Sequence, residues 1–338
     1  MAWRRLQSHP GKVRHKGESG TPDWYARRAR LRAAVFDVQD NELWAHQPVV
    51  AASVTTGVLT EVRPDAIVLE GSRGTEFLAV SMETVTWLGA HASPSVLRAG
   101  DRVIVRHRSP DANSFGHRLA TRIWARIGRV AGTIVEARRG ELIVDSHGRQ
   151  RQRVRIAPAS ARQIEVRFPR LAPGYLIDVI GTRHRDYLLA VAPATAQPPY
   201  RAGHFPQPPL VSAPVTMPVS GSAVWHEPDD EPQDLLGLGY PAIDQDTGEQ
   251  PPDGTGCVRL PYLSLGSAVR VRNECAGRTA MLPITSEGVV ARQFCDRCVD
   301  CGTSPKGRVA DLTMAAFVEL GGNLEDGCFN ATLTTMTG

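Results

Sequence analysis

The feature of this sequence that most constrains its fold is an internal repeat of about 75 residues. The segment Gly57-Val-Leu-Thr-Glu61 recurs 75 positions later as Gly132-Thr-Ile-Val-Glu136, and each copy is followed by an apolar triplet and an acidic residue. Farther along, Ala99-Gly100 and Pro173-Gly174 open two more similar segments, 74 positions apart. Similarity at a fixed spacing indicates that one structural unit occurs twice, so we expect two copies of a small domain.

Each copy has the pattern of a small β-barrel. About five runs of four to seven residues, rich in β-branched side chains, are separated by Gly, Pro, Asp or Asn. The 338 residues include 25 prolines and 31 glycines, too many for a helix-rich chain. We therefore predict a mostly β protein in which residues 49–127 and 128–196 form two tandem barrels. In length and pattern these resemble the small oligonucleotide/oligosaccharide-binding-like (OB-like) barrels.

The remaining sequence divides into an arm, a linker and a C-terminal domain. Residues 1–48 are basic and show no apolar periodicity, which predicts a flexible arm and lead-in. Residues 197–255 are rich in proline and then in acidic residues, which predicts a semi-rigid linker. Residues 256–338 contain every cysteine of the chain and form the predicted third domain.

The C-terminal segment carries several signals in a fixed order. Leu260-Pro261 and Leu265-Gly266-Ser267 precede an alternating strand pattern, and Asp311-Leu312-Thr313 precedes a helix predicted over residues 313–320. This order resembles the double-psi β-barrel of the rare-lipoprotein-A, expansin and barwin-like proteins. The resemblance covers about 80 of the 338 residues and implies a double-psi β-barrel over residues 256–338.

Members of that family act on wall polysaccharides, either by cleaving them or, in expansins, by loosening them without cleavage. Cleavage needs a carboxyl group that serves as general acid or base. Where the peptidoglycan-cleaving branch has a histidine and an Asp-Arg-Gly-Pro segment, this chain has Cys257 and Thr285-Ser286-Glu287-Gly288. The resemblance therefore implies a polysaccharide-binding protein without efficient catalysis. A lytic transglycosylase or hydrolase of the same family is the alternative.

Two carboxylates are candidates for a catalytic role in that alternative. Asp311 corresponds to the aspartate that the family places at the start of the helix, and Glu287 is a displaced carboxylate near the missing Asp-Arg-Gly-Pro segment. Each has a plainer interpretation. Asp311 could cap the helix, and Glu287 could be a solvated loop residue.

The cysteines favour a domain held by disulfide bonds. An even number confined to one small domain predicts three bonds, which would compensate for a small core, although the pairing stays open. One alternative is a zinc site formed by Cys295, Cys298 and Cys301 with a fourth cysteine, and another is reduced thiols. No other cofactor motif is present. The six residues are Cys257, Cys275, Cys295, Cys298, Cys301 and Cys328.

The charge distribution suggests an anionic partner for the second repeat. Residues 128–196 carry 12 basic and 6 acidic side chains, whereas residues 197–338 carry 9 and 17. Alternating arginines would form a basic stripe on one face of a strand, which suits wall glycan or another anionic polymer, although a solvated barrel face has the same pattern. The scarcity of neighbouring aromatic residues argues against nucleic acid. The stripe consists of Arg149, Arg151, Arg153 and Arg155.

The location signals conflict. Disulfide bonds indicate the cell envelope or the extracellular space, but the first residues lack the apolar block of a signal peptide. No run approaches the roughly 18 apolar residues of a membrane helix, so membrane insertion is not expected. A third hypothesis resolves the conflict by unconventional export. According to this hypothesis, the chain is a structural component of an extracellular or phage-like assembly, or it forms a homo-oligomer. The tandem barrels would then make the contacts between subunits.

Overall fold

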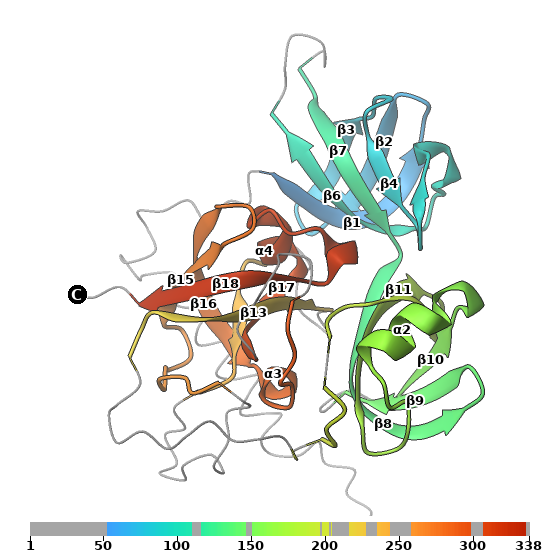
Figure 1. The fold of residues 1–338 in the computed structure, drawn as a ribbon. Helices are drawn as coiled ribbons and strands as arrows, with labels where there is room; N and C mark the ends of the chain where they lie inside the picture. Colours follow the sequence, from blue (N-terminus) through green and yellow to red (C-terminus); the bar gives the residue numbers. More distant parts are fainter. Residues whose placement is uncertain are drawn as a thin grey trace, which may run out of the picture. The chain divides into compact units, whose positions relative to one another are not determined.

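The protein is mostly β and forms three closed small barrels, as its sequence pattern predicts (Figure 1). The predicted arm, residues 1–48, lies outside the part of the chain that is described. The computed structural model describes residues 53–109, 116–146, 151–196, 198–202, 204, 216–227, 235–243, 258–298 and 307–335.

The first barrel is closed by a parallel pairing between β3 and β7. Around it the strands run in the order β3-β2-β1-β6-β7, and β4 and β5 extend the sheet beyond β7. Its core includes Leu59, Ile67 and Leu78, all 1% exposed or less. The elements are β1 (Val54–Val62), β2 (Ala66–Gly71), β3 (Gly74–Ala79), β4 (Val85–Trp87), β5 (His91–Ala92), the 3₁₀ turn η1 (Pro94–Val96), β6 (Arg102–Arg108) and β7 (Arg118–Ala125).

The second barrel repeats this arrangement. Its closed order β10-β12-β11-β8-β9 has a parallel pairing between β10 and β12, the counterpart of the β3–β7 pairing. The helix α2 buries Ile164 against the barrel core. The elements are β8 (Ile127–Arg138), β9 (Glu141–Asp145), β10 (Gln152–Ile156), η2 (Pro158–Ser160), α2 (Ala161–Arg167), β11 (Leu176–Arg183) and β12 (Leu188–Pro193).

The two glycines of the sequence repeat occupy equivalent places in the two barrels. A Cβ atom on Gly57 would lie 2.4 Å from the carbonyl oxygen of Glu70, and one on Gly132 would lie 2.1 Å from that of Asp145. In each barrel the first strand therefore approaches the second so closely that only glycine fits. The repeat that the sequence shows is thus a repeat of barrel geometry.

The third barrel is closed by six strands in the order β13-β17-β14-β16-β15-β18. Two of its pairings, β13–β17 and β14–β16, are parallel. The elements are β13 (Val219–His226), β14 (Leu238–Tyr240), β15 (Ala268–Asn273), β16 (Thr279–Glu287), α3 (Val289–Arg292), β17 (Arg308–Thr313), α4 (Met314–Glu319), η3 (Leu324–Asp326) and β18 (Cys328–Thr335).

Strands β13 and β14 lie in the segment for which the composition indicated a linker. Trp225 of β13 and Tyr240 of β14 are 1% and 0% exposed, so this segment contributes large side chains to the core. The third barrel therefore begins at Val219 and not at residue 256. The prolines and acidic residues around these two strands dominate the composition of this segment, which hides the strands in a sequence window.

The predicted helix is present as α4, but its N-cap is a different residue from the one expected. The side-chain oxygen of Thr313 accepts a hydrogen bond from the backbone N–H of Ala316, while Asp311 lies inside β17. The interpretation of Asp311 as a helix cap is therefore wrong. Its carboxylate is available for another contact.

In the described part of the chain, no helix is long and apolar enough to cross a membrane.

Candidate functional site

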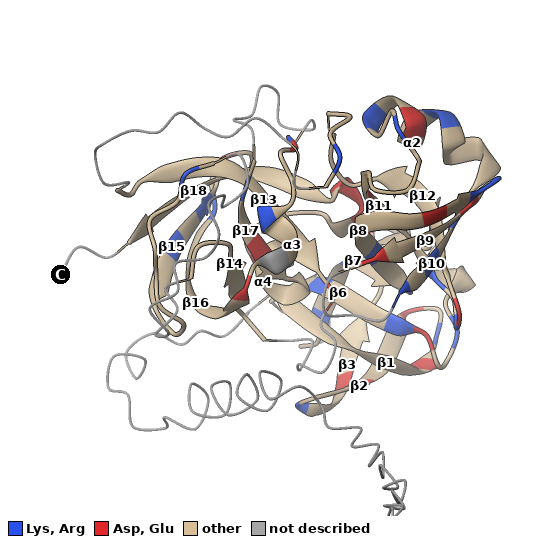
Figure 2. Cartoon of the chain, turned by 90° about the horizontal axis from the view of Figure 1, so that it is seen from below, with Lys and Arg blue, Asp and Glu red and all other residues tan. Residues whose placement is uncertain are grey.

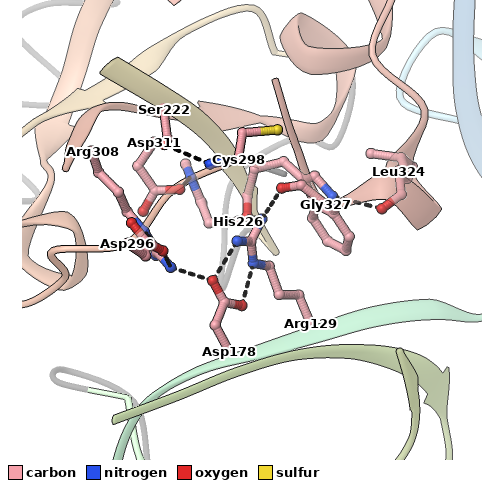
Figure 3. A network of polar contacts seen from close by, with 11 residues as sticks. Arg129, Asp178, Ser222, His226, Asp296, Cys298, Arg308, Asp311, Leu324 and Gly327 are labelled. Carbon is pink, nitrogen blue, oxygen red and sulfur yellow. Dashed lines mark hydrogen bonds and ion pairs between the residues drawn. The ribbon is translucent and has the colours of Figure 1, made fainter. Parts of the chain in front are cut away.

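Asp311, the main candidate from the sequence, lies on β17, one of the six strands of the third barrel. In the strand pairing it is opposite Val224 of β13 and Gly239 of β14. Its carboxylate Oδ1 is 3.3 Å from Nδ1 of His226, at the end of β13 (Figure 3). The Asp311 side chain is 13% exposed and that of His226 is 26% exposed, so solvent reaches the pair mainly at the histidine.

The surroundings of Asp311 keep its carboxyl group ionised. Burial alone raises its pKa, but the nearby His226, Arg129 and Arg308 outweigh this effect and lower the pKa below its ordinary value. An aspartate already titrates well below neutral pH. Asp311 is therefore a carboxylate at neutral pH and has no proton to donate.

The two arginines near Asp311 belong to a buried network of charges. The Nε and Nη2 atoms of Arg129, on β8, donate to the two carboxylate oxygens of Asp178, on β11, at 2.8 and 2.5 Å. Its Nη1 atom donates to the carbonyl oxygens of Trp225 and Gly327, at 2.9 and 2.8 Å (Figure 3). Arg129 thus joins the second barrel to the backbone of the third.

Arg308 of β17 forms the other half of the network. Its Nε and Nη2 atoms donate to Oδ2 of Asp296 at 2.9 and 2.6 Å, and Nη2 also donates to Asp178. Its guanidinium lies 3.7 Å from the ring centroid of Phe294. Burial opposes the charge of Arg308, but Asp296 and Asp178 raise its pKa above the ordinary value. The positive charges of two buried arginines are therefore compensated by the negative charges of two buried aspartates, in a place that water does not reach.

The burial pattern of the strands explains why charged residues lie here. All six residues of β17 are buried, and seven of the eight residues of β11 are buried. One face of each strand covers its own barrel core, and the other face is also covered, so a polar side chain on either strand must find a partner. Asp178 and Arg308 provide one for each other.

Glu287, the second candidate carboxylate, is the last residue of β16 and lies opposite Tyr240 of β14. Asp311 lies across the other edge of β14, opposite Gly239. Strand β14 therefore separates the strands of the two candidates. The side chain that the fold brings to Asp311 is His226.

The sequence pattern gave no indication of His226 as a site residue, because it lies in the segment predicted as a linker and has no metal-ligand spacing to another histidine. The run that ends in Trp225-His226 contains mostly small and apolar residues. That run was the one signal that could have indicated a strand ending in a polar residue.

Part of the predicted basic stripe lies among the described residues of the second barrel. Arg151, Arg153 and Arg155 are exposed, whereas Arg149 lies outside the described residues. Arg153 and Arg155 both form ion pairs with Glu141, at 3.6 and 3.1 Å, so their charge is partly neutralised. Figure 2 shows basic and acidic residues interspersed on this barrel.

Aromatic rings that sequence spacing did not reveal lie beside the stripe. The guanidinium of Arg155 is 4.4 Å from the ring centroid of Tyr187, and the Tyr187 and His184 rings stack with centroids 4.5 Å apart. These residues are more than 25 positions from Arg155, so only the parallel pairing of β10 and β12 brings them together.

The described cysteines fall into two groups. Cys275 and Cys295 are disulfide-bonded. Cys298 and Cys328 are buried and pack with Val224 in one small apolar cluster. Cys257 and Cys301 lie outside the described residues. Among the described residues, no group of three or more His, Cys, Asp and Glu side chains is arranged to hold a metal ion, and the zinc alternative stays a prediction.

No protein-family model matches the sequence, and no curated protein matches it.

Proposed function

We propose that this chain is a cell-envelope or extracellular protein whose third barrel binds wall polysaccharide without cleaving it. The observation that carries the proposal is the state of Asp311, an ionised and largely buried carboxylate beside His226 and two arginines. The leaving oxygen of a glycosidic bond has to be protonated by a group that holds a proton at the working pH. Asp311 does not meet this requirement.

The Leu-Pro segment of the family resemblance supports a binding role. Leu260 is buried, and the carbonyl oxygen of Pro261 accepts a hydrogen bond from the Tyr240 hydroxyl at 2.9 Å. The next residue, Tyr262, is 49% exposed. An exposed aromatic ring on an anchored backbone offers a flat apolar surface with little entropy to lose, which suits the face of a sugar ring.

Two further features support the proposed location and ligand class. Disulfide bonds, such as those of Cys275 and Cys295, persist in oxidising compartments. The exposed guanidinium groups of Arg153 and Arg155 match the carboxylates or phosphates of an anionic wall polymer. A long polymer could contact both the third barrel and this stripe.

The binding proposal is tested by co-sedimentation of the full oxidised chain with insoluble wall polysaccharide. Tyr262→Ala is expected to weaken binding by about tenfold, the effect of losing one well-placed aromatic contact. Met82→Ala is the matched control because Met82 is fully exposed between β3 and β4 of the first barrel, which has no part in the proposed binding. Equal binding by wild type and both variants at all concentrations would remove Tyr262 from the site, and no binding by wild type would remove the proposal.

The His226–Asp311 pair favours a second candidate, a glycan-cleaving enzyme. A carboxylate beside Nδ1 orients an imidazole and stabilises its protonated form, so His226 would transfer the proton in place of a carboxylic acid. Mass spectrometry of glycan strands incubated with the protein separates the candidates. Soluble fragments released by wild type but not by His226→Gln or Asp311→Asn would establish the enzyme, and the absence of fragments would exclude it.

A further inference from the structure

The segment 294–298, which follows α3, is held by both the second and the third barrel. The backbone N–H and C=O of Arg297 exchange hydrogen bonds with Ala196, just past β12, at 3.1 and 3.2 Å. One residue further, the N–H of Cys298 donates to the Ser222 hydroxyl of β13 at 3.1 Å. A segment of only a few residues therefore connects the two barrels.

Asp296 is the charged residue of this segment, and it completes the buried network. Its side chain is 0% exposed and accepts both hydrogen bonds from Arg308, while its backbone carbonyl accepts from the N–H of Gly307 at 2.8 Å. Without Asp296, Asp178 would be the one carboxylate that forms ion pairs with both arginines, and Asp311 would be the other negative charge near them. An unbalanced buried charge is far more costly than a balanced set.

The disulfide-bonded residue Cys295 precedes Asp296 directly and is 3% exposed. A covalent bond at this position removes much of the freedom of the neighbouring backbone. We propose that the disulfide bond of Cys295 holds Asp296 against Arg308, so that the second and third barrels open as one cooperative unit only when this bond is formed.

In the reduced chain the two barrels would fluctuate independently. Reduction requires a dithiol, which supplies two electrons and two protons, becomes a disulfide itself and leaves two thiols on the protein. The segment 294–298 would then lose the covalent constraint at Cys295, and Asp296 could exchange Arg308 for water. Arg129 and Arg308 would compete for Asp178, which weakens the contact between the barrels.

The second barrel offers a clean readout because residues 127–193 contain no cysteine. Any change in this barrel on altering Cys295 must be transmitted through the contacts with the third barrel. Amide hydrogen exchange reports such openings strand by strand. The informative peptides are those of β8 and β11, which carry Arg129 and Asp178.

The experiment is hydrogen exchange with mass spectrometry on the full oxidised chain. Cys295→Ser and Asp296→Asn are expected to speed exchange in the β8 and β11 peptides by at least about tenfold, since each disturbs the balanced network. Asn273→Ala is the matched control. Asn273 is 1% exposed and donates to the carbonyl oxygen of Leu320, so its loss disturbs the third barrel without touching the network.

The proposal is overturned if the rate of hydrogen exchange in the β8 and β11 peptides is the same in Cys295→Ser as in wild type. It is also overturned if Asn273→Ala raises this rate as much as Cys295→Ser does. Protection of the β15 and β16 peptides shows whether the third barrel of a variant is folded. If Cys295→Ser does not fold, wild type reduced after folding is measured instead, and reoxidation is expected to restore slow exchange. None of these outcomes depends on polysaccharide binding, so the two proposals stand or fall separately.

Discussion

At the scale of single residues, environment decides what each titratable group can do. Asp311 and His107 are both buried groups with lowered pKa values, but for different reasons. Nearby positive charges lower the pKa of Asp311 against the effect of burial, whereas burial itself lowers the pKa of His107 to about 4, with Arg118 adding to the effect. The first group is therefore held charged and the second is held neutral.

The state of His107 predicts a pH dependence of stability. Its pKa is about 4 in the folded first barrel and 6.5 in its ordinary state, so the folded form excludes a proton that the unfolded form binds. The contribution of neutral His107 to the free energy of unfolding is fully present above pH 6.5. It is lost as the pH falls toward 4, and the total loss is on the order of 3 kcal/mol. The free energy of unfolding, measured by urea denaturation from pH 7 to 4, is expected to fall.

The control for this prediction is His107→Gln, which keeps a hydrogen-bonding side chain but cannot titrate. The variant is expected to be less stable than wild type at pH 7, because it disturbs the contact with the Thr55 hydroxyl at 3.1 Å. It should also show a flatter pH dependence. Equal slopes for the two proteins would show that His107 does not titrate as described.

At the scale of elements, the first strand of each of the first two barrels depends on a close approach that a side chain would prevent. Gly132→Ala is expected to destabilise the second barrel by about 3 kcal/mol, because its Cβ would collide with the backbone of Asp145. Gly140 of the same barrel has a φ of 73° but nothing within 4 Å of a Cβ, so Gly140→Ala is expected to cost only about 1 kcal/mol.

Thermal unfolding of the two glycine variants measures this difference. Gly132→Ala is expected to lower the midpoint of unfolding clearly more than Gly140→Ala. If the two variants melted together, the shared glycine of the repeat would have no steric role, and the equivalence of Gly57 and Gly132 would lose its physical explanation.

At the scale of the whole molecule, the barrels and the repeat could be predicted from the sequence because both depend on local periodicity and turn residues. The contacts between barrels could not. Arg129 and Asp178 are 49 positions apart, and Arg308 is 130 positions from Asp178, with no pattern to connect them. The motif Asp311-Leu312-Thr313 marks Asp311 in the sequence, whereas its partner His226 ends a strand that lies among prolines and gives no periodic signal.

The difference between local patterns, which the sequence shows, and contacts between distant residues, which it does not show, also applies to the surface of the second barrel. Alternation in the sequence was enough to indicate that Arg153 and Arg155 share a face. The stacking of Arg155 on Tyr187 depends on the parallel pairing of β10 with β12, which is a property of the closed barrel. Site residues that come from one strand are thus accessible to sequence reasoning, whereas those assembled across strands need the fold.

The charge state of Asp311 decides between polysaccharide binding and cleavage by its carboxyl group, and a carbon-13 NMR titration of that group in the full chain measures the charge state directly. Asp311→Asn identifies the resonance. We expect a midpoint below that of an ordinary aspartate, because His226, Arg129 and Arg308 favour the carboxylate. A midpoint near or above neutral pH would contradict this expectation and would make Asp311 a competent catalytic acid.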